Sequence, residues 1–304
     1  MTGASGFIGS NLLPKLAGHE LHVVERYVTG RYGTFGREVI THFLDLNDAN
    51  VVRQMISRVK PDVLIHLASI SPVSYSYDHP SEVLETNLLA TVNLAEACSV
   101  VSGFSHMIYA GTSEEYGMAT DRPVTEESGC IPNSPYSVSK YAGTKYLLYL
   151  NIAKQFPVTI MRATNTFGRT RDTHFFVERT LVQMLRGGRV TLGDPRPVRD
   201  FMFVDDHVSA YLRVLAERDK AVGHVFNFST GSHATIEEYA ERMSQIVGYR
   251  GDLVWNSIPE RPLDIPDHRI DSNKAKRTLG WEAKIPFDEG VRKTIEGLKS
   301  SGIA

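Results

Sequence analysis

The stretch that decides the fold is Thr2–Gly9, TGASGFIG, in which three glycines at intervals of three residues open a helical pattern. Glycine lets the backbone come close to a bound group, and a helix N-terminus offers unpaired N–H groups and positive potential. Both features suit the pyrophosphate of a dinucleotide. The residues of this turn that we predict to contact a dinucleotide are Gly3, Ser5, Gly6, Phe7, Ile8 and Gly9.

Two acidic side chains follow the turn at positions that a dinucleotide site requires. Glu25 ends the strand pattern Leu21–Glu25, where a carboxylate can accept hydrogen bonds from the adenosine ribose. Asp45 and Leu46 end the next strand pattern, Thr41–Leu44, where a carboxylate can meet the adenine amine. Because Glu25 would repel the additional phosphate of NADP, we expect NAD to be preferred, although Arg26 and Arg31 lie close enough in sequence to offset part of this.

The strand that should precede the glycine turn is missing, because the chain begins at Met1. In a doubly wound sheet this strand lies at the centre. We therefore expect the native reading frame to start further upstream, with a valine codon of the sequence V-T-G read as the start M-T-G.

The remaining pattern predicts a Rossmann-type α/β fold. Short β-branched runs alternate with amphipathic segments in the first half, which is typical of a doubly wound parallel sheet with helices on both faces. The strands are expected at 21–25, 41–44, 63–67, 106–110, 158–162 and 224–228. The helices are expected near 7–17, 48–59, 82–101, 136–155, 175–187, 205–217, 235–247 and 287–299, with a kink at Pro14.

The less regular second half predicts a smaller C-terminal α/β domain. We assign residues 1–163 and about 200–230 to the dinucleotide-binding domain, and about 164–199 and 231–304 to a substrate domain. The first glycine turn belongs to the former, and the Gly/Pro-rich stretch that follows the 175–187 helix belongs to the latter.

Composition excludes several classes of protein. The 304 residues carry 33 Lys and Arg against 35 Asp and Glu, a balance that gives no support to nucleic-acid or polybasic membrane binding. No apolar run approaches a spanning helix, and glycines interrupt what would be a signal peptide. The two cysteines form neither a disulfide framework nor a metal-ligand set. We expect a cytoplasmic protein without a metal.

A second pattern places a tyrosine and a lysine on one helix face. Tyr136 and Lys140 stand four residues apart, and an ammonium beside a phenol lowers the pKa of the phenol. Such a tyrosine can be a general base for an alcohol being oxidised. Upstream, Thr112, Ser113 and Glu114 follow the fourth predicted strand, and ligands of parallel sheets collect at strand ends. We expect these side chains to share one site.

These elements together resemble the extended short-chain dehydrogenase/reductase family of nucleotide-sugar enzymes. The resemblance covers nearly the whole chain and includes His66-Leu67-Ala68, Asn87, Arg162, Asn165, Gly168, Arg199-Asp200-Phe201 and Arg261-Pro262. It implies that Leu67 and Ala68 contact the cofactor, as do Tyr136 and Lys140.

The resemblance also implies a nucleotide-diphosphate sugar as substrate. In the family, the threonine that matches Thr112 hydrogen-bonds the sugar C4 hydroxyl. The positions of Asn165, Arg199 and Arg261 are associated with the diphosphate and the nucleotide. Family members pair the helices near 82–101 and 136–155 in a four-helix bundle, and both segments carry apolar residues on more than one face. We therefore expect a homodimer.

The Thr-x-Glu segment resembles that of the 4,6-dehydratases, and Ser113 resembles the GDP-mannose dehydratases in particular. The resemblance implies that Tyr136 takes the C4 hydroxyl proton while hydride passes to NAD, and that Glu114 takes the C5 proton before water leaves C6. The hydride then returns to C6. Ser113 is a poor acid, so Glu114 is a candidate for both transfers, while we expect Glu115 to be a solvated charge.

Other activities remain open. A 4-epimerase usually lacks the glutamate, and the 4-keto-6-deoxy-sugar-nucleotide reductases share a similar S-E-E-Y-G segment and an R-P-x-D-V-P motif that resembles Arg261–Pro266. The UDP-glucuronate decarboxylases share Thr-Ser-Glu but differ around Tyr136. A catalytically silent dinucleotide-binding module is the alternative from a different class. The nucleotide base and the sugar cannot be read from the sequence.

Overall fold

The core of the fold is a four-stranded parallel sheet, and a separate pair of parallel strands extends it at one edge. The computed structural model describes residues 1–26, 35, 36, 38–259 and 261–304. Four parallel strands lie in the order β10-β5-β4-β3, and β1 pairs with β2, also in parallel. The bounds are β1 Leu21–Glu25, β2 Val39–Phe43, β3 Val63–His66, β4 His106–Ala110, β5 Val158–Ala163 and β10 Val225–Phe228.

The first residues of the chain join these two groups of strands. Thr2 forms parallel bridges to Val24 of β1 and to His66 of β3, and its amide donates to the carbonyl of Ile65. The glycine turn therefore leaves the sheet between β1 and β3. The bridge also places the turn at the carboxyl ends of the neighbouring strands.

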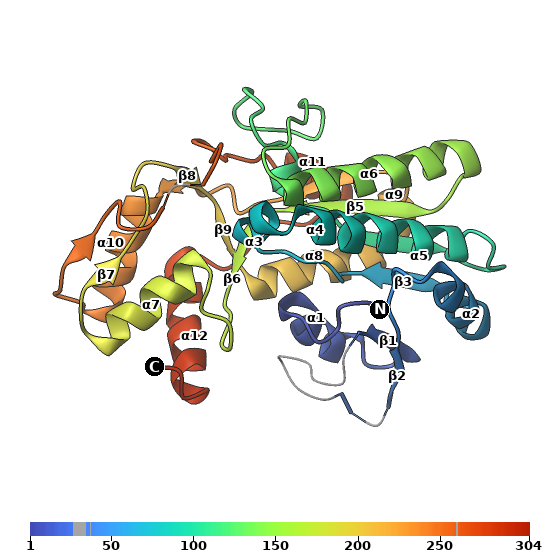
Figure 1. The fold of residues 1–304 in the computed structure, drawn as a ribbon, viewed down its shortest axis with the longest axis horizontal. Helices are drawn as coiled ribbons and strands as arrows, with labels where there is room; N and C mark the ends of the chain where they lie inside the picture. Colours follow the sequence, from blue (N-terminus) through green and yellow to red (C-terminus); the bar gives the residue numbers. More distant parts are fainter. Residues whose placement is uncertain (27–34, 37, 260) are drawn as a thin grey trace.

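Helices cover both faces of the sheet (Figure 1). One face packs against α2 (Ala49–Val59), α5 (Ala90–Cys98) and α6 (Pro135–Lys154), with the apolar side chains of all three in one buried cluster. The other face packs against α1 (Phe7–Leu12) and α8 (Val204–Ala216). This arrangement confirms the predicted doubly wound α/β fold, and the described residues contain no helix that is long and apolar enough to cross a bilayer.

Two helical predictions differ from the structure. The predicted kink at Pro14 is a change of helix type, because α1 ends at Leu12 and Leu13–Leu16 continue as a 3₁₀ helix. Proline lacks the amide that an α-helix needs in its interior, but it is tolerated near a helix start. The single helix expected near 82–101 is divided into α4 (Pro80–Leu84), a π-helical turn at Glu85–Leu89 and α5.

The second half adds short strands and helices beside the sheet. Its strands pair as β6 with β9, β8 with β11 and β7 with β12. The strand bounds are β6 Asn165–Phe167, β7 Val190–Thr191, β8 Val198–Arg199, β9 Phe201–Phe203, β11 Ala234–Thr235 and β12 Leu253–Val254. The helix bounds are α7 Phe176–Arg186, α9 Arg218–Ala221, α10 Ile236–Val247, α11 Asn273–Leu279 and α12 Phe287–Ser300. A short α3, Val73–Asp78, was not predicted.

Candidate active site

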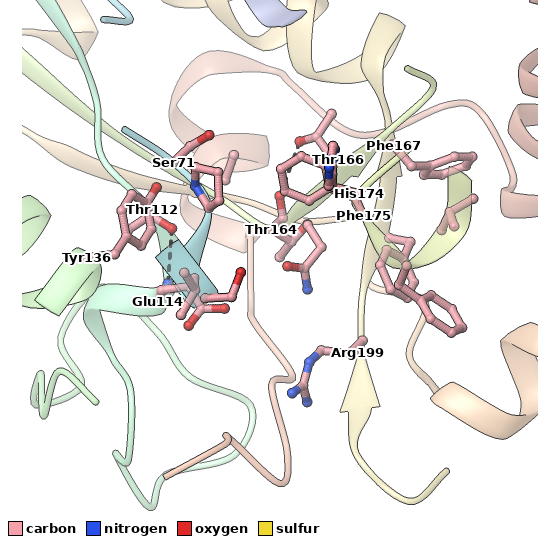
Figure 2. Close-up of a pocket in the computed structure, with 18 of the residues that line it drawn as sticks. Ser71, Thr112, Glu114, Tyr136, Thr164, Thr166, Phe167, His174, Phe175 and Arg199 are labelled. Carbon is pink, nitrogen blue, oxygen red and sulfur yellow. Dashed lines mark hydrogen bonds between the residues drawn. The ribbon is translucent and has the colours of Figure 1, made fainter. Parts of the chain in front are cut away.

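A cleft of about 1050 Å³ lies between the sheet and the second half of the chain. Figure 2 shows Thr112, Glu114 and Tyr136 on one side of it and Arg199 on the other. The predicted site residues that line it are Gly3, Gly6, Phe7, Ile8, Gly9, Leu67, Thr112, Glu114, Tyr136, Lys140, Asn165, Arg199 and Arg261. The fold thus brings residues from each of the three predicted groups, cofactor, catalytic and substrate, to one cavity.

The glycine turn has the close packing that its sequence implies. Gly3 has a φ of 68°, and a Cβ at this position would lie 2.7 Å from the amide nitrogen of Ala68. Both the left-handed backbone and the lack of space therefore require glycine here. The amide of Ser5 donates to the Glu25 carboxylate at 2.9 Å, and the Ser5 hydroxyl donates to the same group. This contact holds the acid that ends β1 beside the turn.

Some predicted cofactor residues do not line the cleft in the described part of the chain. These are Ser5, Glu25, Asp45, Leu46 and Ala68. Asp45 forms an ion pair of 2.9 Å with Arg26 and accepts a hydrogen bond from the amide of Asn47.

A 3₁₀ turn, Ser113–Glu115, positions the predicted catalytic residues that follow β4. Thr112 is the N-cap, and its hydroxyl accepts a hydrogen bond from the Glu114 amide at 3.2 Å. The Glu114 carboxylate lies in the cleft, whereas Ser113 is buried and is not among the described residues that line it. The turn therefore separates the two adjacent side chains.

Burial dominates the acidity of the tyrosine. It raises the pKa of Tyr136 above its usual value, while a hydrogen bond with the Thr112 hydroxyl lowers it and the carboxylates of Glu114 and Glu115 raise it. The expected lowering by Lys140 is not among these causes. The Lys140 ammonium instead lies 4.5 Å from the centre of the Tyr109 ring, and burial lowers its pKa to about 8. The prediction that this pair depresses the tyrosine pKa is therefore wrong for the protein alone.

Glu115 is not the solvated charge that we expected. It is fully buried, and its carboxylate forms an ion pair with Arg162 at 2.8 Å. It also accepts hydrogen bonds from the Thr112 amide and the Thr144 hydroxyl. Buried carboxylates need such partners, and these contacts close a capping box that fixes the backbone of the turn. Glu115 thus fixes the backbone that carries Thr112 and Glu114, and it is not available as a base.

Four carboxylates line the cleft within the described residues, and three of them are paired. Glu178 holds Arg169, Asp194 holds Arg196, and Asp264 holds Arg199. Glu114 has no ion-pair partner among the described residues. It is therefore the cleft carboxylate that is free to exchange a proton with a ligand beside Tyr136.

The predicted substrate residues approach the cleft from the opposite side. Asn165 begins β6, which follows β5 directly. Arg199 is mostly buried and donates to the carbonyl of Ile265 at 2.7 Å as well as to the carboxylate of Asp264. Arg261 lies in the loop that precedes Asp264 and has no ion-pair partner among the described residues.

Sequence reasoning missed several residues of the cleft. Among them are Ser71, Thr164, Thr166, Phe175 and Arg179. Thr164 follows the end of β5 and Thr166 lies in β6, on either side of Asn165, and the predicted topology could have flagged this strand end. The other three lie in or beside segments without a motif, so no signal in the sequence distinguished them.

The sequence comparisons identify the family. A family model described as GDP-mannose 4,6 dehydratase matches residues 1–294. The chain belongs to this family of extended short-chain dehydrogenase/reductase enzymes. Similar relatives include a UDP-glucose 4-epimerase of Mycolicibacterium smegmatis, 30% identical over 99% of this chain and 98% of the relative. A dTDP-glucose 4,6-dehydratase of Haemophilus influenzae is 27% identical over 97% of this chain and 96% of the relative.

Solved structures of similar proteins share the whole fold. The UDP-glucose 4-epimerase of Thermotoga maritima, solved with UDP-glucose, aligns with a TM-score of 0.91 at 30% identity and covers 98% of this chain and 97% of its own. The UDP-glucose 4-epimerase of Thermus thermophilus, solved with NAD, aligns with a TM-score of 0.87 at 27% identity over 98% and 97% of the two chains. Relatives at such identities differ in reaction, so the family fixes the enzyme class and the coarse chemistry.

Proposed function

We propose that the protein is an NAD-dependent nucleotide-sugar 4,6-dehydratase that forms a 4-keto-6-deoxy sugar nucleotide. The observation that supports this most is the unpaired Glu114 carboxylate, which lines the cleft together with Thr112 and Tyr136. A dehydratase needs a base at C5 in addition to the tyrosine that acts at C4, and Glu114 is our candidate for that base.

The glycine turn, Leu67, Tyr136 and Lys140 would hold NAD, because all of them line the same cleft and the glycines of the turn present no side chain to a pyrophosphate. Glu25 would accept from the adenosine ribose, and we keep Asp45, Leu46 and Ala68 as neighbours of the adenosine. When bound, NAD supplies the hydride acceptor and a positively charged ring. On this proposal residues 1–163 and about 200–230 bind the cofactor, while about 164–199 and 231–304 bind the nucleotide sugar.

The protein's own residues then divide the proton transfers between them. Tyr136 accepts the proton of the C4 hydroxyl, and Thr112 hydrogen-bonds the same hydroxyl to orient it. A ketone at C4 acidifies C5, so that Glu114 can remove the C5 proton. Because the Ser113 side chain is buried away from the cleft, Glu114 also protonates the departing C6 oxygen. Water leaves, C6 takes up the hydride that C4 released, and C5 takes up a proton that balances the one Tyr136 accepted from the C4 hydroxyl.

The test of this function is a panel of nucleotide sugars incubated with the NAD-loaded enzyme and analysed by mass. Loss of one water from a substrate supports the dehydratase. An isomer of unchanged mass indicates the 4-epimerase, and 4-keto sugar nucleotides with reduced cofactor test the reductase. Cofactor binding without turnover of any sugar nucleotide would instead indicate a silent binding module.

The reductase is the second candidate, because a specific contact involves the segment that resembles the reductase motif. Asp264 of the segment Arg261–Pro266 holds Arg199 at the substrate side of the cleft. This segment resembles the reductase R-P-x-D-V-P motif, and the contact gives its aspartate a defined role. The 4-epimerase shares the family and the cleft, but like the reductase it needs no base at C5, and no contact of this kind among the described residues favours it.

We expect NAD to bind more tightly than NADP, on the order of tenfold or more at low salt, because the Glu25 carboxylate would face the additional phosphate. Arg26 is held by Asp45 and is not free to offset this repulsion fully. Arg31 lies outside the described residues. Calorimetric titration of both cofactors measures the ratio, and Glu25→Gln should narrow it. Equal affinities in the unmodified enzyme would contradict the role of Glu25.

We propose a homodimer that pairs α5 and α6 with their copies. Leu94, Leu147 and Leu150 face the core, but Tyr149 and Ile152 of α6 are exposed, the latter by 84%. Light scattering at micromolar concentration should give twice the chain mass of 33.9 kDa. Ile152→Glu should shift the protein toward the monomer, whereas Val51→Glu, at an exposed apolar residue of α2, should not. A monomer mass for the unmodified chain would refute the dimer.

A further inference from the structure

Five arginines line the cleft within the described residues, and they differ in how their charge is balanced. Three of them hold a carboxylate: Arg169 pairs with Glu178, Arg196 with Asp194, and Arg199 with Asp264. Arg179 and Arg261 hold none among the described residues. The cleft therefore contains two guanidinium groups without a counter-ion on its substrate side.

Arg179 has an unsatisfied donor. It lies in the first turn of α7, four residues after Phe175, whose side chain gives the helix no cap. Its Nε atom is buried and has no hydrogen-bond partner in the described part of the chain. A buried donor without a partner is costly, and such groups in native proteins usually await a ligand, an ion or water.

The two free arginines influence each other. Burial lowers the pKa of Arg179, and the charge of Arg261 lowers it further. Two like charges close together in a partly buried cleft are unfavourable until an anion joins them. Their combined charge of about two matches the two negative charges of a diphosphate diester, and planar guanidinium groups recognise phosphate in bidentate geometry.

We propose that Arg179 joins Arg261 in a clamp for the diphosphate of the sugar nucleotide, beside Arg199, which Asp264 holds in place. This inference rests on the proposed function and adds Arg179 as a binding residue. The Arg199 guanidinium differs from the other two in that it donates to Asp264 and to the carbonyl of Ile265, which fix its orientation in the cleft.

The proposal predicts how nucleoside diphosphates bind. We would titrate UDP, GDP and dTDP into the NAD-loaded enzyme by calorimetry and compare the unmodified chain with Arg179→Gln. Loss of one charge-assisted contact to phosphate should weaken the affinity for the best-binding nucleoside diphosphate by about 10- to 100-fold. The salt dependence of binding should fall as well, because one ion pair is lost. Arg179→Lys, which keeps the charge but not the planar fork, should lie in between.

Arg186→Gln is the matched control. Arg186 lies on the same helix, is exposed, and donates to the carbonyl of Ile303 outside the cleft. Its removal changes the net charge equally and should leave diphosphate affinity unchanged. The affinity for NAD should remain unchanged in Arg179→Gln, since the cofactor pyrophosphate belongs at the glycine turn.

The outcomes are separable. A diphosphate affinity and salt dependence of Arg179→Gln equal to those of the unmodified chain would overturn the clamp while leaving the proposed function intact. Failure of the unmodified chain to bind any nucleoside diphosphate would overturn both. Should Arg179→Gln melt at a lower temperature than the unmodified chain, Arg179→Lys provides the affinity comparison, and an affinity equal to that of the unmodified chain would count against the clamp.

Discussion

Tyr136→Phe is expected to suppress the reaction at its first step, by roughly 10²- to 10⁴-fold, because the C4 hydroxyl then has no base within reach. The ring of Tyr136 is mostly buried, so phenylalanine keeps the packing and removes only the hydroxyl that Thr112 contacts. Formation of reduced nicotinamide in a single turnover, followed by absorbance, measures this step directly. The variant should show neither this absorbance nor loss of water.

Lys140 gives the same step a dependence on pH. Burial lowers the pKa of Lys140 to about 8, so that its charge is present below that pH and disappears as the pH rises through it. We expect kcat/KM to fall above about pH 8, because the Lys140 cation then no longer stabilises the negative charge that develops on Tyr136 in the complex with cofactor and substrate. Lys140→Met should lack this change. Stability responds in the opposite direction, since the unfolded chain binds this proton more tightly and the contribution of Lys140 to folding rises with pH between about 8 and its ordinary value. A parallel loss of activity and melting temperature would contradict this assignment.

A control separates the tyrosine from a general weakening of the site. Thr112→Val removes the hydroxyl that caps the turn and contacts Tyr136, but it leaves the base in place. It should reduce the rate less than Tyr136→Phe does. Near-normal formation of reduced nicotinamide in Tyr136→Phe would show that another group takes the C4 proton.

The sheet could be predicted from the sequence because its signals are local. Leu21–Glu25 and His106–Ala110 form strands over the predicted ranges, since each is a β-branched or aromatic run bounded by turn residues. The helix near 82–101 could not be predicted in detail. Its π turn contains Asn87, whose amide contacts the backbone of Ile70 and the hydroxyl of Ser139, and these partners are distant in sequence.

The site residues also divide into those that local sequence predicted and those that only the tertiary fold shows. The glycine turn and the Thr-Ser-Glu segment carry their chemistry in adjacent residues, so the sequence indicated them together. The sequence could not predict the different environments of two adjacent acidic residues. Glu114 and Glu115 have the same side chain, but in the 3₁₀ turn Glu114 lies in the cleft and Glu115 is paired with Arg162 in the core. Arg179 was missed because only the tertiary fold shows which arginines lack a carboxylate.

The difference between these two glutamates determines the last prediction. Glu114→Gln should separate the two halves of the reaction, because oxidation at C4 relies on Tyr136, Lys140 and Thr112, whereas elimination needs a base at C5. Glutamine retains the shape and one acceptor but cannot take a proton at neutral pH. We expect reduced nicotinamide to form on the enzyme and to persist, while loss of water falls by roughly 10²- to 10⁴-fold.

Two further variants show whether this effect belongs to the base itself. Glu114→Asp keeps a carboxylate on a shorter side chain, so it should retain part of the water loss that Glu114→Gln abolishes. Glu127→Gln removes an equal charge at an exposed position outside the cleft and should leave both half-reactions unchanged. Near-normal turnover of the true substrate by Glu114→Gln would mean that this carboxylate is not the C5 base. The reductase and the 4-epimerase, which need no such base, would then be favoured, because Glu115 is held in the core by Arg162 and cannot replace it.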